Sequence, residues 1–119
     1  MDRRQHLQAL AALAALGAGV PAFPPGSFPS KTLSLVVAYA PGGPTDAMAR
    51  VLASAIKPHL GGQTMIVENK AGAGSNIGAE YVARAEADGH TLMFGTSAPL
   101  GINLYLYQKI NYDPFKSFA

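Results

Sequence analysis

The sequence contains no cysteine among its 119 residues. This absence excludes disulfide bonds, thiol catalysis, metal ligation by cysteine and a lipid-modified cysteine anchor. Charged residues are also scarce, at 13% of the chain, whereas hydrophobic residues make up 49%. Such a composition is typical of one packed globular domain and not of a disordered chain.

An excess of basic charge is lacking as well. The nine basic residues include Arg3 and Arg4 and the seven acidic residues include Asp2, so seven basic and six acidic residues remain after position 22. A nucleic-acid surface needs basic residues that cluster on one face, often with aromatic residues that stack on bases. We therefore expect no nucleic-acid partner.

Motifs for catalysis and metal binding are missing or incomplete. His6, His59 and His90 are isolated in the sequence, so we expect surface or turn histidines and no metal site. No P-loop pattern occurs. The stretch around Ser97 begins like a nucleophile elbow but has Pro99 where the second glycine belongs. We expect no catalytic residue.

Residues 1–22 have the pattern of an export signal. Arg3 and Arg4 form a positive segment, residues 7–20 are rich in alanine and leucine, and we expect cleavage after Ala22. The apolar segment is shorter than the roughly 20 residues that cross a bilayer. The paired arginines also resemble a twin-arginine signal, so both Sec and twin-arginine export remain open. In a Gram-negative host the product is expected in the periplasm.

The segment after the leader predicts a linker and then a buried strand. Three prolines in residues 23–30 indicate an extended linker over residues 23–32. Residues 33–39 are almost wholly apolar instead of alternating, as expected of a parallel strand covered on both faces.

The remaining pattern alternates helices and strands. A first helix is predicted to start at Thr45 or Asp46 as N-cap and to end at Pro58, and its apolar positions are Met48, Val51, Leu52, Ala55 and Ile56. Further elements are predicted as strands over 64–68 and 91–94, a helix over 76–86 with Ile77, Ala79, Val82 and Ala83 for packing, and a short helix over 102–107. The β-α-β-α-β order predicts an α/β fold with a parallel sheet and right-handed crossovers.

Three compact polar loops follow the three predicted strands. They are Y-A-P-G-G-P-T-D at residues 39–46, a glycine-rich stretch at 68–78, and Gly95-Thr96-Ser97. Ligands of open α/β sheets bind outside the carboxyl ends of the strands. Helix N-termini there offer unpaired N–H groups and a positive dipole end to carboxylate, phosphate or sulfate. The sequence therefore predicts an anion-binding crevice.

Several side chains near these loops have two interpretations. Asp46 either caps the first helix or binds a ligand amine or hydroxyl, and Asn76 either caps the second helix or contacts ligand. Tyr39 either walls the pocket or packs in the core. Arg50 and Lys70 either pair with an acid or, as we expect, lie on solvated surfaces.

The glycine spacing also leaves an enzyme alternative. Gly72, Gly74 and Gly78 form G-x-G-x-x-x-G, one residue longer than the dinucleotide fingerprint, and they follow the second strand instead of the first. We expect no cofactor, with an α/β enzyme that binds a phosphorylated cofactor at these loops as the alternative.

Residues 28–119 resemble the periplasmic receptors of tripartite tricarboxylate transporters, also called Bug proteins. Five blocks in order carry the resemblance: F-P-S-K at 28–31, A-P-G-G-P-T-D-A-M-A-R at 40–50, V-E-N-K-A-G-A-G-S-N-I-G-A at 67–79, A-D-G-H-T-L-M-F-G-T-S at 87–97 and Y-D-P-F-K-S-F-A at 112–119. The resemblance implies a monomeric receptor of the type II periplasmic-binding-protein kind, whose two α/β lobes close on a small carboxylate and dock on a membrane permease.

The resemblance also implies which residues face the ligand. They are Tyr39, Ala40, Pro41, Gly42, Gly43, Thr45, Asp46, Gly74, Ser75, Asn76, Thr96 and Ser97. Pro44 has no N–H to offer, and Ser75 stands where the family often has glycine. On this basis residues 33–119 are the N-terminal part of the first lobe, and we expect a truncated receptor or a non-functional receptor remnant.

Overall fold

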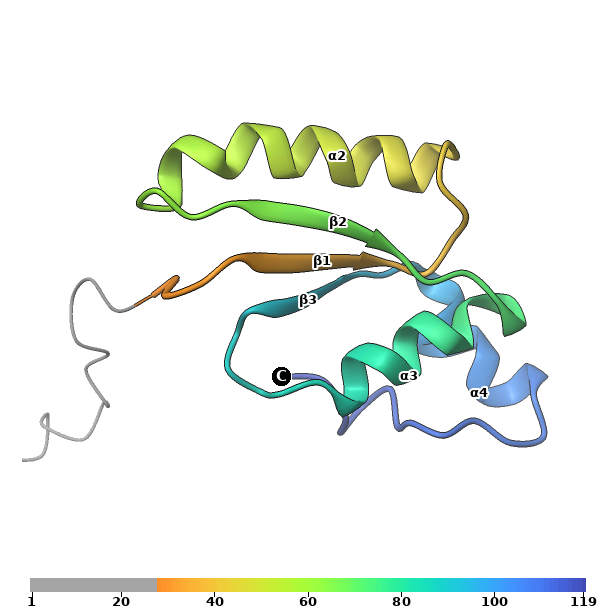
Figure 1. Ribbon diagram of the computed structural model, residues 1–119. Coiled ribbons are helices and arrows are strands. Elements are labelled where there is room, and N and C mark those ends of the chain that lie inside the picture. The colour runs from red at the N-terminus through yellow and green to blue at the C-terminus, as the bar shows by residue number, and fades with distance from the viewer. Residues whose placement is uncertain (1–27) are drawn as a thin grey trace, which may run out of the picture.

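The computed structural model describes residues 28–119, and the predicted leader lies outside them (Figure 1). Six main elements follow one another along the chain: β1 (Leu33–Val37), α2 (Pro44–Ile56), β2 (Met65–Asn69), α3 (Asn76–Arg84), β3 (Thr91–Phe94) and α4 (Asn103–Leu106). Short 3₁₀ turns at Lys57–His59 and Ala73–Ser75 and a π-helical turn at Ala98–Ile102 complete the backbone. Within residues 28–119, no helix is both long and apolar enough to cross a membrane.

The three strands form one parallel sheet with the order β2-β1-β3. The β1–β2 register runs from Leu33 opposite Met65 to Val37 opposite Asn69. β1 lies between the other two strands, and four of its five residues are buried. The uniform apolar character of this segment follows from that position, because a central parallel strand is covered on both faces. The predicted α/β fold with a parallel sheet is confirmed.

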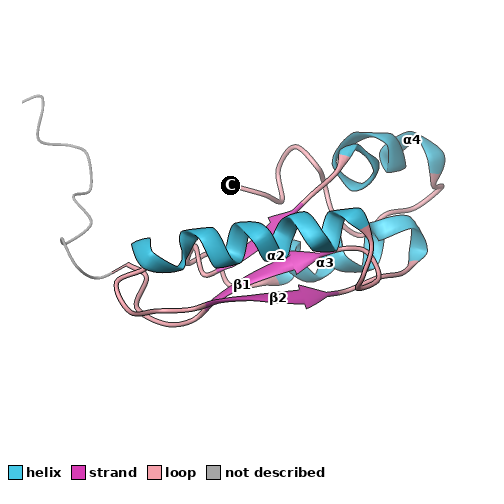
Figure 2. Cartoon of the chain, turned by 90° about the horizontal axis from the view of Figure 1, so that it is seen from above, coloured by secondary structure: helices cyan, strands magenta, loops and turns pink. Residues whose placement is uncertain are grey.

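The two longer helices cover opposite faces of the sheet. α2 packs against β1 and β2, whereas α3 packs against β3 and β1 (Figures 1 and 2). The chain steps from β1 to β2 on one side and then returns to place β3 on the other side of β1. The strand order therefore reverses between β1 and β3, and this is the point at which open α/β sheets bind their ligands.

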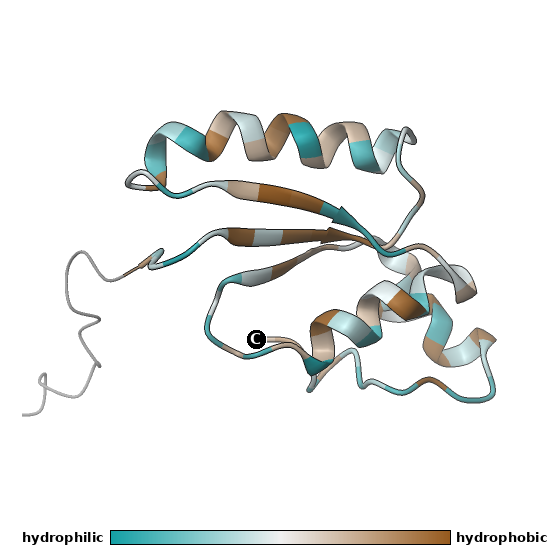
Figure 3. Cartoon of the chain, in the orientation of Figure 1, coloured by the Kyte–Doolittle hydropathy of each residue, from teal (hydrophilic) through white to brown (hydrophobic). Residues whose placement is uncertain are grey.

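The hydrophobic core lies between β1 and α2. Leu33, Leu35 and Val37 from β1 pack with Ala49 and Ala53 from α2. Figure 3 shows the corresponding hydrophobic colouring along the strands. On the other face, a Cβ added at Gly78 of α3 would lie 2.6 Å from the Cβ of Ala38, so this helix approaches the end of β1 too closely for a side chain.

The packing face of α2 differs from the apolar positions noted in the sequence. Met48 and Val51 are 61% and 69% exposed, while Ala49 and Ala53 are buried. Alanine lets the helix backbone approach the sheet. Met48, Val51 and Leu52 lie on the outer side, whereas Ile56 packs against the core. Because apolar residues occupy more than one face of this helix, periodicity alone did not identify the buried one.

The predicted bounds of the second helix and of two strands also differ from the structure. α3 ends at Arg84, two residues before the predicted end, and its buried residues are Gly78 and Ala79, while Ile77 is exposed. β1 is two residues shorter than predicted and β2 is shifted by one, whereas β3 has the predicted bounds.

A polar network fastens the amino ends of the strands. The side chain of His90, in the turn before β3, is buried, and its Nε2 accepts the N–H of Ser30 at 3.1 Å. The ring of Phe28 packs on the imidazole with centroids 4.8 Å apart. Asp88 accepts the N–H of His90 at 2.9 Å and pairs with Lys31 Nζ at 2.8 Å. This end of the sheet lies opposite the three loops.

Candidate functional site

Three loops meet at the carboxyl edge of the sheet, as predicted. They follow β1, β2 and β3, which run parallel, so their first residues emerge side by side (Figure 1). Tyr39 connects the first loop to the other two: its hydroxyl pairs with Thr96 Oγ1 at 2.5 Å, and its carbonyl accepts from Asn69 Nδ2 at 3.1 Å. The three loops therefore form one connected surface.

The first loop leads into α2 without a side-chain cap. The N-cap is Gly43, with extended backbone and no side-chain hydrogen bond, so the prediction that Thr45 or Asp46 caps the helix is wrong. Pro44 occupies the first helical position, where its missing N–H leaves no bond unmade. Within residues 28–119, no acceptor faces the amide N–H groups of Gly43, Thr45 and Asp46. These open amides stand at the positive end of a 13-residue helix.

Asp46 is buried at the third position of α2, and both of its carboxylate oxygens are engaged. Oδ2 accepts the N–H of Gly42 and the Nε–H of Arg50, each at 2.9 Å, and Oδ1 accepts Nδ2 of Asn69 at 2.9 Å. The hydrogen bond from Arg50, followed by those from Gly42 and Asn69, holds the pKa of this carboxyl well below its usual range. Asp46 is therefore ionised, and each of its oxygens accepts at least one hydrogen bond.

Asn69 is a residue that the sequence analysis did not single out. It ends β2, donates to Asp46 and to the carbonyl of Tyr39, and accepts Arg50 Nη2 at 3.3 Å through Oδ1. Its position as a polar residue at the carboxyl end of a strand was the available signal. Arg50 lies on a solvated helix face as expected, with its side chain 54% exposed, and it also pairs with Asp46, which raises the pKa of Arg50.

The second loop has an unusual backbone. Gly72, Ala73, Gly74 and Ser75 all have positive φ, at 133°, 48°, 62° and 78°. Two of these four residues carry a Cβ in a region that favours glycine. The turn brings the N–H of Ser75 to the carbonyl of Gly72 at 3.0 Å and leads directly into α3.

Asn76 does not cap α3. The N-cap is Ser75, again without a side-chain bond, and Asn76 is the first helical residue. Its Oδ1 accepts from Asn103 Nδ2 at 2.7 Å and from the Tyr112 hydroxyl at 2.9 Å. Asn103 also donates to the carbonyl of Gly74 at 2.7 Å. The second loop is thus tied to the C-terminal part of the chain through buried polar groups.

The third loop contributes one ordered side-chain contact. Thr96 is half-buried and pairs with Tyr39, whereas Ser97 is exposed at the start of the π-helical turn. The Tyr39–Thr96 pair spans the gap between the ends of β1 and β3, where the strand order reverses. Tyr39 is therefore partly buried against the hydrophobic core, and its hydroxyl joins the first loop to the third.

Lys70 lies in the second loop, whereas His59 and His90 lie away from the three loops. The Lys70 ammonium lies 4.4 Å from the centroid of the Tyr81 ring, His59 is exposed, and His90 is at the opposite end of the sheet. In residues 28–119 no group of three or more histidine, aspartate or glutamate side chains could hold a metal ion.

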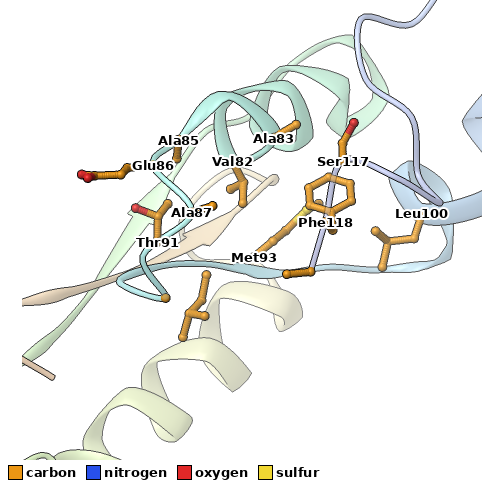
Figure 4. Close-up of a pocket in the computed structure, with 13 residues that line it drawn as sticks. Val82, Ala83, Ala85, Glu86, Ala87, Thr91, Met93, Leu100, Ser117 and Phe118 are labelled. Carbon is orange, nitrogen blue, oxygen red and sulfur yellow. The ribbon is translucent and has the colours of Figure 1, made fainter. Parts of the chain in front are cut away.

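A hollow of about 400 Å³ lies on the α3 side of the molecule (Figure 4). Val82 and Ala83 from α3, Met93 from β3 and Phe118 near the C-terminus line it. A second hollow lies along α3, beside Tyr81. Neither hollow is lined by a residue of the predicted site.

Comparison with known proteins adds a family match and sequence relatives. The family described as tripartite tricarboxylate transporter family receptor matches residues 48–119. Over 87 residues the chain is 44% identical to protein BugT of Bordetella pertussis. The aligned segment covers 72% of this chain and 26% of BugT. The chain thus spans about a quarter of the length of this relative.

Solved structures share the fold. MatC from Rhodopseudomonas palustris, solved with bound malate, is 41% identical with a TM-score of 0.71 over 76% of this chain and 30% of that one. A second R. palustris protein, solved with adipate, is 38% identical with a TM-score of 0.70 over 74% of this chain and 29% of that one. The periplasmic binding protein BugD is 39% identical with a TM-score of 0.67, over 76% and 29% of the two chains.

Proposed function

Because the chain belongs to the tripartite tricarboxylate transporter receptor family, we propose that it forms part of an extracytoplasmic receptor that binds a small carboxylate for uptake. The observation that supports this most directly is the set of open amides at Gly43, Thr45 and Asp46 at the start of α2. Main-chain N–H groups at a helix N-terminus attract an anion through hydrogen bonds and through the helix dipole. Relatives solved with malate and with adipate agree with an acid as the ligand class.

In this proposal the ligand carboxylate lies over the first loop, between the ends of β1 and β3. Ordered waters complete the contacts, because a bridging water holds a ligand nearly as well as a direct hydrogen bond in enthalpy. The residues proposed to line the site are those implied by the resemblance: Tyr39, Ala40, Pro41, Gly42, Gly43, Thr45, Asp46, Gly74, Ser75, Asn76, Thr96 and Ser97. The opposite wall of the pocket comes from chain beyond the described residues.

The family is one of solute receptors, which supports binding without turnover over the enzyme alternative. We further propose that the protein acts in the periplasm after export and delivers its solute to a membrane permease. Residues 33–119 then form the N-terminal part of the first lobe, and residues 1–22 the cleaved leader.

The test uses a matched pair of substitutions at Gly43 in the complete gene product, with whatever sequence its reading frame encodes after Ala119. Gly43→Ala keeps the main-chain N–H, and its Cβ would meet only the carbonyl of Ala40 at 3.8 Å. Gly43→Pro removes the N–H, and the φ of −80° at this position suits proline. Both proteins are titrated by calorimetry with malate, adipate, citrate and acetate.

We expect one class of acid to bind the wild-type protein and the alanine variant equally. The proline variant should bind about tenfold more weakly, as is typical for the loss of one hydrogen bond to a charged group. Binding of nucleotides but of no carboxylate would contradict the proposed function. Equal affinity of all three proteins for a carboxylate would contradict the role of the first loop.

A further inference from the structure

We propose that Asp46 and Asn69 are positioning residues that lock the first loop to the end of β2, and that the carboxylate of Asp46 does not touch the ligand. The two residues hold the segment between Tyr39 and Gly42, which leads to the open amides at the start of α2. The lock is the set of hydrogen bonds that join Asp46, Asn69 and the first loop. Its effect on ligand binding rests on the proposed function, whereas the lock itself rests on these bonds alone.

Both carboxylate oxygens of Asp46 are already engaged by donors of this chain. Its side chain is only 4% exposed, and three donors from three elements converge on it: Gly42 from the loop, Arg50 from α2 and Asn69 from β2. A carboxylate is an acceptor, so it repels the carboxylate of a ligand. The hydrogen bond from the Gly42 N–H to Asp46 Oδ2 means that Asp46 holds the first loop in place.

The first loop is held at both of its ends. Asn69 Nδ2 binds the carbonyl of Tyr39, where the loop begins, and Asp46 Oδ2 binds the N–H of Gly42, where the loop turns toward α2. The same Asn69 nitrogen bonds Asp46 Oδ1, which joins the two attachments. Gly42 has a φ of 90°, so the turn depends on glycine as well as on this lock.

The negative charge of Asp46 is balanced by a neighbouring cation. Asp46 places a negative charge in the same first helical turn as the amides that we propose as an anion site, and Arg50 balances it with an Nε–Oδ2 distance of 2.9 Å. Arg50 also orients Asn69 by donating to its Oδ1. An amide at position 46 would have one acceptor oxygen for three donors, so at least one bond of the lock would be lost.

The test compares Asp46→Asn and Asn69→Ala with a matched control, Asp88→Asn, in the complete gene product. Asp88 likewise accepts a main-chain N–H and a cation, but it lies at the amino end of the sheet. Amide hydrogen exchange of Gly42 is measured without ligand, and binding of malate, adipate, citrate and acetate is measured on the same proteins. Asn69→Ala removes the lock without changing charge, which keeps the test decisive if Asp46→Asn fails to fold.

We expect exchange at Gly42 to rise about tenfold or more in both site variants and to stay unchanged in the control, because a freed amide loses its protection. Affinity for the acid that binds the wild-type protein should fall about tenfold in the same two variants, the size of effect typical for a hydrogen bond to a charged group.

Unchanged exchange at Gly42 would overturn the proposal whatever happens to binding, and weaker binding with unchanged exchange would mean that Asp46 meets the ligand itself. A wild-type protein that binds no carboxylate would refute the proposed function, while the exchange comparison would still decide whether the lock exists.

Discussion

At the scale of single residues, Asp88 carries the clearest dependence on pH. The hydrogen bond from Lys31, followed by that from the His90 N–H, lowers the pKa of Asp88 from 3.8 to about 2. A carboxyl whose pKa is depressed in the folded protein stabilises the fold above its unfolded pKa and loses that contribution as the pH falls through its folded pKa. The contribution of Asp88 should therefore be complete above pH 5 and disappear between about pH 4 and pH 2.

The measurement is urea unfolding of the wild-type protein and of Asp88→Asn from pH 2 to pH 6. Above pH 5 the wild-type protein should have a higher urea midpoint than Asp88→Asn. The difference between the two midpoints should disappear as the pH falls below 4. Other carboxyl groups, including Asp46, titrate in both proteins and do not change the comparison. A difference between the two urea midpoints that stays constant down to pH 2 would show that Lys31 and the His90 N–H do not lower the pKa of Asp88 in solution.

At the scale of elements, the approach of α3 to β1 depends on Gly78. A Cβ there would lie 2.6 Å from the Cβ and 2.9 Å from the Cα of Ala38, and 2.9 Å from the carbonyl of Lys70. Two of these three atoms belong to the backbone, so the helix has to shift. We expect Gly78→Ala to lower the free energy of unfolding by about 1–3 kcal/mol, the usual cost of overpacking.

Gly101 provides the matched control, because a Cβ at this position meets nothing within 4 Å. Gly101→Ala should leave stability unchanged or raise it slightly, since alanine restricts the unfolded chain. Both variants are compared by chemical unfolding. Equal stability of Gly78→Ala and the wild-type protein would show that α3 packs farther from the sheet.

The elements also show what the sequence could and could not predict. β1 was predictable because its residues are uniformly apolar, and the three loops were predictable because parallel strands place their ends together. The packing face of α2 was only partly predictable, since small alanines face the sheet together with Ile56, while Met48, Val51 and Leu52 face outward. That choice depends on how close the helix can come, which is a property of the packed pair.

The candidate site also has parts that the sequence predicted and parts that only the fold reveals. Sequence predicted that Asp46 belongs to the site region, yet its partners Asn69 and Gly42 come from other elements, and only the fold brings them together. The positive φ of Ala73 and Ser75 was equally hidden, because neither residue type favours that conformation. Whether the predicted residues contact a ligand stays a prediction.

At the scale of the whole molecule, much apolar surface is open in residues 28–119. Tyr105, Leu106 and Phe115 are 87%, 71% and 76% exposed, and β2 and β3 each pair only with β1 among the described residues. Open strand edges and large apolar patches favour association between chains. We expect residues 28–119, produced alone, to associate at concentrations of about 10 μM and above.

Sedimentation velocity measures this association, with the double variant Tyr105→Ser/Leu106→Ser as comparison. The variant should stay monomeric to higher concentrations, because it removes two exposed apolar side chains. A wild-type segment that sediments as a monomer over the whole range would show that these surfaces do not drive association.

The open amides at the start of α2 belong to the main chain, so every amino acid except proline supplies them. Random genetic drift can therefore rewrite Gly43 and Thr45 without deleting the donors, provided that the backbone keeps its course. Two descendants could then differ widely in these loops and still capture an acid group, while a change elsewhere altered which acid they prefer. The ability to hold an anion is inherited with the shape of the chain, and selectivity evolves around it.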